Sequence, residues 1–512
     1  MEASRRKNFY TNISVGMIQR GVTLVTSFVN RTVFIYTLGM AYLGVGGLFT
    51  DILTIFSLAE LGIGSAITYH LYKPLAENNK EKIKSLMHFY KVCYRVIGVV
   101  ILIVGLCIVP FLDYLITDTD NAIQINIEIV YLLYLTNTVT SYLFFAYKTT
   151  LLSAAQKVYK SQLIDIAYSV VSTIIFSIVL LYYRDFIVYL VVKIGCDIIK
   201  NVIISKEIDR VFPLLKEKAY QKFSKDEIKQ ISENIYAVFV GKISGTIFTS
   251  TDSIIISRYI GTILVGISDN YRMIIRNIIS LGGIFTGALL PAVGDMAARQ
   301  SRQECQKRFT NYNFLCFWIY SLIAICMAHT FNSFIIPWIG EENTFAQITV
   351  LVLVLNFWLD LILQIVYSFR AAYGLYKYGE YIQLIGAVCN IFLSIKLIPI
   401  MGITGVFFAT TITNLPTFLY PFYLFKYGFQ SSSLEYYKKL LGQVGALFIA
   451  YIVSGYCCKV IVIGGYLEFI LKGLVCVLIT NLIFFFLYFK TDEFRFIKKE
   501  ILVLYNKVLR RG

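Results

Sequence analysis

The chain has 512 residues, of which 57% are hydrophobic and 15% are charged, and its mean hydropathy is +0.68. Soluble domains are about 45–50% apolar and about 25% charged, so this composition excludes an ordinary soluble protein. The net charge of +16 does not require nucleic acid as a partner, because the charges cluster between apolar runs, where basic loops can face an anionic lipid leaflet.

Long apolar runs repeat from one end of the sequence to the other. Runs of about 18 or more mostly apolar residues predict transmembrane helices. We therefore predict an all-α polytopic membrane protein with about 14 transmembrane helices, or spans, over residues 13–38, 42–72, 90–112, 122–147, 161–183, 185–206, 231–258, 262–290, 311–336, 345–369, 379–399, 402–427, 438–459 and 463–489. The N-terminal segment lacks an A-x-A-like cleavage site, so we expect a retained tail.

Cations mark one side of this predicted topology. If both termini lie on the same side, 36 of the 47 Lys and Arg residues fall in loops and span ends on that side. The opposite side is poor in cations and carries acids such as Asp113, Glu341 and Glu342. The positive-inside rule therefore places both termini in the cytoplasm.

An internal repeat indicates how the spans are grouped. A shift of 222 residues aligns YTLGMAYLGVGG (36–47) with RYIGTILVGISD (258–269), and it pairs Gly39 with Gly261 and Gly44 with Gly266. Such repeats are common in transporters. We therefore predict two parallel six-helix lobes and two additional helices, namely an N-lobe over 1–215 with spans 1–6, a C-lobe over 216–427 with spans 7–12, and spans 13–14 with a basic cytoplasmic tail over 428–512.

Span 1 contains two arginines, which cannot lose their charge. Arg20, Thr23, Ser27 and Arg31 follow one another at intervals of 3, 4 and 4 residues, so they form one polar stripe on a helix. The repeat places Lys242 of span 7 opposite Arg20. An ionised residue in the bilayer centre costs about 2.5–3.5 kcal/mol and needs water, a counter-ion or an anionic ligand. Span 7 repeats the stripe with Lys242, Gly245, Thr249 and Ser253. The two stripes suggest a shared aqueous cavity; alternatively, Arg20 and Lys242 snorkel to the cytoplasmic interface.

Span 8 carries the most deeply placed cations. In GISDNYRMIIRNIISLGG (266–283), Asp269, Arg272 and Arg276 lie at i, i+3 and i+7, on one helical face. Two arginines and one aspartate leave an excess of positive charge, and the planar guanidinium group suits phosphate. We therefore predict a site for a substrate phosphate; the alternative is a buried ion network with Asp252 of span 7 or Glu60 of span 2.

Further features have more ordinary interpretations. Lys193 and Asp197 are spaced i, i+4, which predicts a structural ion pair. The two prolines of span 12, Pro416 and Pro421, predict a kink. Glu60 is interpreted equally well as a cation or proton site and as the partner of an arginine. The three histidines and ten cysteines form no HExxH or CxxC motif and no P-loop is present, so we expect no enzyme, catalytic residue, metal or cofactor.

Two stretches carry a family resemblance. ELGIGSAITYHLYKPL (60–75) and TDSIIISRYIGTILVGISDNY (251–271) resemble the Wzx-type polysaccharide flippases of the multidrug/oligosaccharidyl-lipid/polysaccharide exporter (MOP) superfamily. The resemblance extends to the 14 spans, the two lobes and the basic cytoplasmic face. It implies a flippase that moves undecaprenyl-pyrophosphate-linked oligosaccharide repeat units across the cytoplasmic (plasma) membrane of a bacterium by alternating access. The products would be capsule, exopolysaccharide or O-antigen-type polysaccharide, and coupling to H⁺, Na⁺ or the membrane potential stays open.

The resemblance also assigns roles to residues. In the related lipid II flippases, arginines of spans 1, 2 and 8 are functionally important; span 2 has no arginine here, so its role falls to Arg31 or is filled differently. We accordingly expect substrate binding by Arg20, Arg31, Lys242, Arg272 and Arg276, and a supporting or ion-coupling role for Glu60, Asp252 and Asp269.

Two other functions are considered. A cation-coupled drug antiporter of the same superfamily would typically carry an acid in span 1, which here has arginines and no acid. A membrane-embedded polysaccharide polymerase or acyltransferase would usually need a large extracytoplasmic loop or a well-placed histidine, and the predicted outer loops are short.

Overall fold

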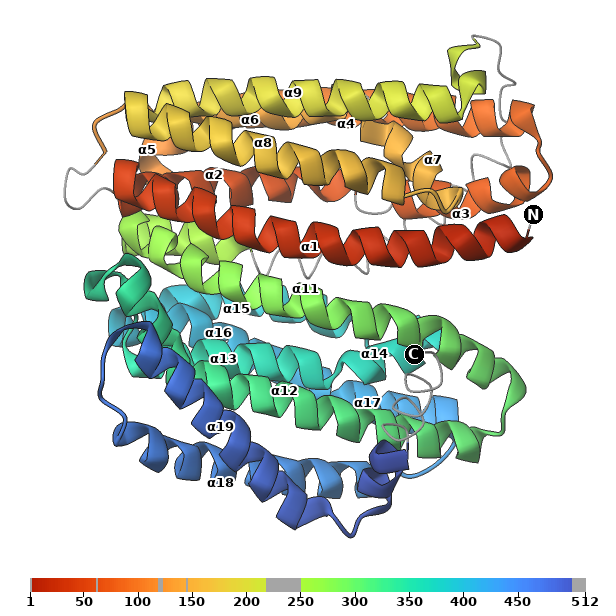
Figure 1. Ribbon diagram of the computed structural model, residues 1–512, viewed down its shortest axis with the longest axis vertical. Helices are drawn as coiled ribbons and strands as arrows, with labels where there is room; N and C mark the ends of the chain where they lie inside the picture. The colour runs from red at the N-terminus through yellow and green to blue at the C-terminus, as the bar shows by residue number, and fades with distance from the viewer. Residues whose placement is uncertain (1, 61–62, 118–122, 144–145, 218–249, 500–512) are drawn as a thin grey trace. The chain divides into compact units, whose positions relative to one another are not determined.

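The computed structural model describes residues 2–60, 63–117, 123–143, 146–217 and 250–499, and over these residues it is helical without a strand. The all-α fold class is thereby confirmed. By its internal contacts the chain divides into two compact units, Met1–Asp269 and Asn270–Gly512. In each unit, long helices run alongside one another (Figure 1). The lobe boundaries expected from the repeat remain predictions, since residues 218–249 lie outside the described part.

The first unit contains most of the predicted N-lobe. Its helices are α1 (Glu2–Leu38), α2 (Met40–Phe56), α3 (Ile63–Ala76), α4 (Lys80–Ile108), α5 (Leu112–Leu115), α6 (Ile127–Leu143), α7 (Thr149–Ala154), α8 (Tyr159–Tyr183), α9 (Phe186–Val211), a helical stretch over 250–259 and the start of α11 (Thr262–Arg299). Helix α1 packs on α8, α4 on α6, and α9 on both α6 and α8. Aromatic side chains fill the core, where Phe49, Tyr131 and Phe186 are fully buried.

The second unit is organised around α12. Its helices are the remainder of α11, α12 (Arg302–Ile339), α13 (Gln347–Ile362), α14 (Gln364–Ala372), α15 (Glu380–Met401), α16 (Ile403–Asn414), α17 (Tyr420–Tyr423), α18 (Leu434–Lys459) and α19 (Gly465–Tyr488). A capping box stabilises the start of α12. The Ser301 hydroxyl accepts a hydrogen bond from the backbone N–H of Glu304, and the Glu304 carboxylate accepts one from the backbone N–H of Ser301. Helix α12 contacts α13, α18 and α19, and α15 packs on α16.

Spans 4, 5, 6, 11, 13 and 14 are found within about five residues of their expected bounds, whereas spans 1, 3, 8 and 9 lie in helices that extend about ten residues further at one end, and three spans are interrupted. Span 2 is divided into α2, the 3₁₀ turn η1 (Ser57–Glu60) and α3, and span 10 into α13 and α14. Span 12 changes from α-helix to the 3₁₀ turn η7 (Leu415–Leu419), which contains Pro416, so the α-helix is interrupted where the prolines predicted a kink. Hydropathy alone does not reveal such breaks, because it is insensitive to backbone hydrogen bonding. Span 7 falls mostly outside the described residues.

Seven helical segments of the described chain are long and apolar enough to cross a bilayer, among them α8, α12, α18 and α19. Outward-facing apolar side chains follow such helices, for example Ile178 on α8 and Phe448 on α18. Helices α1 and α11 are not in this set, although their 37 and 38 residues exceed the roughly 20 that cross the hydrocarbon core. Polar and charged side chains interrupt their apolar runs, as they do in the 26-residue α9, which is not in this set either.

The repeated glycines bring α2 and α11 into close contact. Gly39 and Gly261, at the junctions before these helices, both have positive φ, +91° and +133°, a conformation that favours glycine. A Cβ atom on Gly44 would lie 1.8 Å from the Thr262 carbonyl oxygen, and one on Gly266 would lie 2.5 Å from the Met40 carbonyl oxygen. The residues paired by the sequence repeat therefore pack against each other, which supports the repeat as a structural one.

We expect Gly44→Ala to destabilise the protein markedly, because the added methyl group would overlap backbone that cannot rotate away. Overpacking of this kind costs about 1–3 kcal/mol or more. Gly195→Ala in α9 is the matched control, since a Cβ there meets no atom within 4 Å and alanine favours helix. Thermal unfolding of the two purified variants should separate them; an equal melting temperature would show that the helix crossing tolerates the methyl group.

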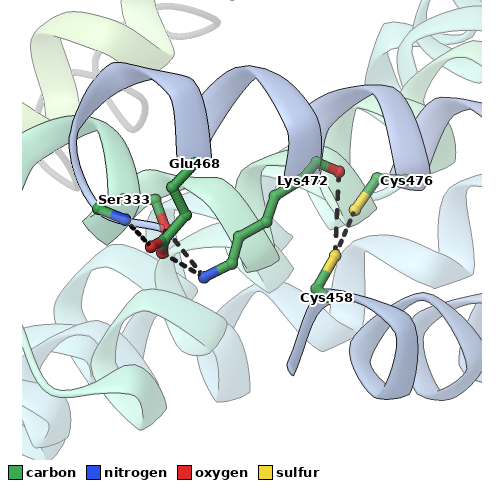
Figure 2. A network of polar contacts seen from close by, with 6 residues as sticks. Ser333, Cys458, Glu468, Lys472 and Cys476 are labelled. Atoms are coloured by element: carbon green, nitrogen blue, oxygen red, sulfur yellow. Dashed lines mark hydrogen bonds and ion pairs between the residues drawn. The ribbon is translucent and has the colours of Figure 1, made fainter. Parts of the chain in front are cut away.

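Helix α19 is held against α12 and α18 by a small polar network (Figure 2). Glu468 Oε1 lies 2.5 Å from Lys472 Nζ, and the Ser333 hydroxyl of α12 donates to the same carboxylate at 3.1 Å. The sulfur atoms of Cys458 and Cys476 approach to 3.6 Å between α18 and α19. Both members of the ion pair are largely buried, so their pairing offsets the cost of removing them from water.

Candidate functional site

The predicted polar stripe of span 1 lies on α1. Since α1 is continuous, Arg20 and Arg31 are about 16 Å apart along the helix axis. Other α1 side chains attach the helix to α8: Gln19 Nε2 donates to Asp165 Oδ2 at 3.3 Å, and Asn30 Nδ2 donates to Thr173 Oγ1 at 3.1 Å. Arg20 is half-buried. These bonds fix the rotation of α1 about its own axis.

Arg31 makes an ion pair with Asp269 of α11. Its guanidinium Nη2 lies 3.5 Å from Asp269 Oδ2, and the two side chains are 13% and 15% exposed. Gly47 of α2 leaves room for this carboxylate, because a Cβ atom there would lie 3.1 Å from the same oxygen. Sequence reasoning grouped Asp269 with Arg272 and Arg276 on one face of a helix. The structure adds an ion partner from α1, which is distant in sequence.

Two further residues complete a cluster around this pair. Tyr134 of α6 interacts electrostatically with Arg31, Asp269 and Lys193, and the Lys193 ammonium lies 5.7 Å from the centre of the Tyr134 ring. Tyr189 of α9 also contributes to the environment of Lys193. We call Arg31, Tyr134, Lys193 and Asp269 the cation cluster. It contains two positive charges and one carboxylate. Asp197 also acts electrostatically on Lys193 but has an ion pair of its own with Lys200, so the cluster carries an excess of positive charge that suits an anion.

The predicted ion pair between Lys193 and Asp197 is wrong. Among the described residues, Asp197 forms its ion pair with Lys200 at 3.4 Å, and it accepts hydrogen bonds from Tyr168 at 2.7 Å and Asn137 at 3.4 Å. Lys193 instead faces Tyr134. The i, i+4 spacing permitted the pair, but Lys200 lies one turn away on the other side of Asp197 and competes for the same carboxylate.

Glu60 lies at the break between α2 and α3, inside a cluster of tyrosines from α4 and α6. Tyr142 Oη donates to Glu60 Oε2 at 2.5 Å, and Tyr94 donates to Oε1. Tyr90, fully buried, donates to Tyr94 at 3.1 Å. Within the described chain the recorded partners of Glu60 are these hydroxyl groups, and no arginine is among them. A carboxyl group bound by neutral donors can hold or release a proton without breaking an ion pair.

Two further acids of the first unit, Asp252 and Asp51, lie in the helical stretch over 250–259 and in α2. Ser253 Oγ donates to Asp51 Oδ2 at 2.5 Å, which connects this stretch to α2. Asp252 is buried, with 5% of its surface exposed. Lys242, the predicted counterpart of Arg20, lies outside the described residues, so its role stays a prediction.

The two arginines of α11 begin the second unit. Arg272 lies with its guanidinium carbon 5.7 Å from the centre of the Phe407 ring of α16. Arg276 is exposed one turn further along the helix. Tyr271 directly precedes Arg272 in sequence. It is buried, and its hydroxyl group donates to Asn332 Oδ1 at 2.6 Å. The continuous helix confirms the predicted spacing of the arginines.

Sequence reasoning missed the tyrosines of both clusters and the place of Lys193. Tyrosine is common in this chain, with 38 copies, so Tyr94, Tyr134 and Tyr142 carry no distinguishing pattern. One signal was available for Tyr90 and Tyr94, since their i, i+4 spacing places both hydroxyl groups on one face of α4. Lys193 was recognised as an intramembrane cation but was assigned to a structural pair.

Comparison with known proteins identifies the fold. No protein-family model and no curated protein matches the chain. The lipid II flippase MurJ in an inward closed conformation aligns with a TM-score of 0.62 at 16% identity, covering 94% of this chain and 99% of that one. An inward-facing multidrug resistance MATE family transporter of the MOP superfamily aligns with a TM-score of 0.56 at 14% identity, covering 77% of this chain and 91% of that one. A mutant of the Vibrio cholerae MATE transporter VcmN aligns with a TM-score of 0.55 at 14% identity, covering 84% of this chain and 98% of that one. The chain therefore has the fold of MurJ and the MATE transporters.

Proposed function

We propose that this chain is a flippase of the MOP superfamily that moves undecaprenyl-pyrophosphate-linked oligosaccharide repeat units across the bacterial plasma membrane by alternating access, with both termini in the cytoplasm. The observation that carries the proposal is the cation cluster, in which Arg31 and Lys193 exceed the charge of Asp269 inside an apolar helical unit. Such charges are costly in a membrane and mark functional sites. The fold shared with a lipid II flippase supports the same function.

The chemistry of the cluster suits a pyrophosphate. A guanidinium group makes paired, charge-assisted hydrogen bonds to phosphate oxygens. Arg31 is already oriented by Asp269, and an arriving pyrophosphate competes with that carboxylate for the same donors. Arg20, Lys242, Arg272 and Arg276 are assigned to successive contacts with the anion during transport. The oligosaccharide and the prenyl chain would be accommodated by polar and lipid-facing surfaces respectively, and the products would supply capsule, exopolysaccharide or O-antigen-type polysaccharide.

Glu60 is the proposed coupling residue. Its carboxyl group is held by tyrosine hydroxyl groups, and it lies where span 2 is broken, so a change in its protonation can alter the local helix geometry. Asp252 and Asp269 are assigned a supporting role. Proton coupling is favoured over Na⁺, because the carboxylate oxygens accept from hydroxyl donors, whereas a bound Na⁺ requires oxygen lone pairs directed towards it.

We expect Glu60→Gln to fold normally and to lose proton-driven transport, because glutamine keeps the hydrogen-bonding shape but cannot exchange a proton. Glu342→Gln, at an exposed turn, is the matched control. Transport into proteoliposomes with and without an imposed pH gradient provides the measurement. If the Glu60→Gln variant still responds to the gradient as the unmodified protein does, Glu60 is a structural hydrogen-bond acceptor and coupling lies elsewhere.

A cation-coupled drug antiporter is the second candidate, favoured by the fold shared with MATE transporters. The half-buried Glu60 would serve it equally well. The arginines of α1 distinguish the two functions, because a cationic drug would be repelled by Arg20 and Arg31. A polysaccharide polymerase or acyltransferase shares the expected pathway, whereas the fold similarities described above are to a flippase and to transporters.

Deletion of the gene followed by lipid analysis separates these functions. A flippase predicts that complete lipid-linked repeat units accumulate in the cytoplasmic leaflet while the polysaccharide disappears from the cell surface. An antiporter predicts normal lipids and increased sensitivity to cationic drugs. A polymerase predicts that single repeat units still reach the outer leaflet but are not joined.

A further inference from the structure

A cavity of about 200 Å³ lies in the second unit, between one end of α12, the segment over Leu424–Phe429, and helices α18 and α19. It is built from residues that take no part in the cation cluster or the Glu60 cluster. Three polar side chains, Asn313, Tyr436 and Gln443, line it and are buried, with 5%, 6% and 5% of their surface exposed. Three charged side chains, Glu435, Lys439 and Glu493, line it as well.

The buried polar side chains have unused hydrogen-bonding atoms. Within the described structure, Asn313 Oδ1, Tyr436 Oη and Gln443 Oε1 are buried and make no hydrogen bond. Buried polar atoms nearly always have a partner, so three of them at one cavity indicate that something occupies it. The neighbouring hydroxyl groups are satisfied: Thr310 Oγ1 donates to a backbone carbonyl at 3.0 Å and Thr491 Oγ1 at 2.8 Å. The deficit is therefore specific to these three side chains.

The charged side chains leave the cavity with an excess of negative charge. Lys439 Nζ lies 3.0 Å from Glu435 Oε1 and 2.8 Å from Glu493 Oε1, so one ammonium group is shared by two carboxylates. Burial raises the pKa of Glu493, but the hydrogen bond and charge of Lys439 and the hydrogen bonds from a backbone N–H and from Thr491 together hold the pKa below its ordinary value. Glu493 is therefore ionised, and its side chain is 14% exposed, whereas Glu435 and Lys439 are 74% and 43% exposed. The more exposed pair marks the mouth of the cavity.

We infer that this cavity binds the primary ammonium headgroup of a phospholipid of the phosphatidylethanolamine class. An ammonium group supplies up to three N–H donors to the unpartnered oxygens, and its charge offsets the second carboxylate. The rings of Phe314 and Tyr488 also line the cavity, and aromatic rings attract ammonium groups. A water molecule needs about 10–15 Å³ of such space, so the cavity holds a group of several non-hydrogen atoms.

The surroundings favour a lipid over a soluble amine. Residues next in sequence to the lining expose apolar side chains, Leu441 of α18 by 72% and Phe489 beyond α19 by 43%. Acyl chains can lie against such side chains, while the exposed Lys438 and Lys490 are close enough in sequence to serve the lipid phosphate. The inference concerns a resident lipid rather than the transported substrate, and it stands or falls independently of the proposed flippase function.

The test is lipid retention by the purified full-length protein, measured by native mass spectrometry after exposure to an equimolar mixture of phosphatidylethanolamine, phosphatidylcholine and phosphatidylglycerol. We expect selective retention of phosphatidylethanolamine. Glu493→Gln and Gln443→Leu should each weaken it about tenfold, the effect of losing one charged or buried hydrogen bond. Glu341→Gln, at an exposed turn outside the cavity, is the control and should retain the lipid fully. Melting temperatures of all variants verify folding.

Three outcomes would overturn the inference. Absence of any preference among the three lipids would show that water fills the cavity. Equal retention by the folded Gln443→Leu variant and the unmodified protein would place the lipid elsewhere on the surface. Displacement of phosphatidylethanolamine by free ethanolamine at equal concentration would identify a site for soluble amines and contradict the lipid assignment.

Discussion

Replacing Arg31 by alanine should abolish repeat-unit transport and also destabilise the protein, because the substitution removes the ion-pair partner of a largely buried carboxylate. The two side chains are 13% and 15% exposed and 3.5 Å apart. Breaking a buried ion pair costs about 3–5 kcal/mol, and we expect the lower end of that range because some solvent reaches this pair. Thermal unfolding of the purified variant and export of polysaccharide in a complemented deletion strain measure the two effects.

A double substitution separates the structural role of Arg31 from its role in transport. In Arg31→Ala/Asp269→Asn the carboxylate that lost its Arg31 ion pair is neutral, so stability should recover towards that of the unmodified protein. Transport should stay absent, since the guanidinium group that we propose to bind the pyrophosphate is still missing. Recovery of transport together with stability would show that Arg31 serves only to neutralise Asp269.

Replacing Arg276 by alanine should remove transport without destabilising the fold. Arg276 is exposed on α11, so truncation leaves no buried cavity behind. Loss of a charged hydrogen bond to phosphate costs about 1.5–3 kcal/mol, which corresponds to a roughly ten- to hundredfold decrease in transport. Arg276→Lys keeps the charge but not the planar fork and should retain part of the activity.

The control for this prediction is Arg299→Ala, which removes an exposed arginine from the last turn of the same helix. Both variants should insert and unfold like the unmodified protein. Undiminished polysaccharide export by Arg276→Ala at normal membrane abundance would contradict the assignment of this residue to substrate binding.

The sequence predicted the helices well because a bilayer leaves few alternatives. Backbone polar groups in lipid must bond within their own segment, so a long apolar run has to be a helix. The repeat was also visible, since glycine is required where Gly44 and Gly266 meet. Interruptions such as that at Ser57–Glu60 were not, because hydropathy does not depend on which backbone hydrogen bonds form.

The candidate site was predicted in part. Arg31 was identified, because an arginine within an apolar run is costly and therefore conspicuous. Its partner was not, because Asp269 is 238 positions away and shares a helix face with two other arginines. The tyrosines that bind Glu60 come from α4 and α6, and nothing in their local sequence distinguishes them from core residues. Lys193 was given the wrong partner because helical spacing allows two pairings of Asp197 and tertiary packing selects one.

The central claim is that this chain moves a pyrophosphate-linked oligosaccharide across a bilayer, and reconstitution tests it most directly. The purified protein would be placed in liposomes containing lipid-linked repeat units, and the fraction accessible to an external glycan-binding probe would be followed over time. The account predicts that the inner-leaflet pool becomes accessible with the unmodified protein and not with Arg31→Ala/Asp269→Asn or Arg276→Ala. An inner-leaflet pool that stays inaccessible, in liposomes where the protein is folded and a pH gradient is imposed, would contradict it.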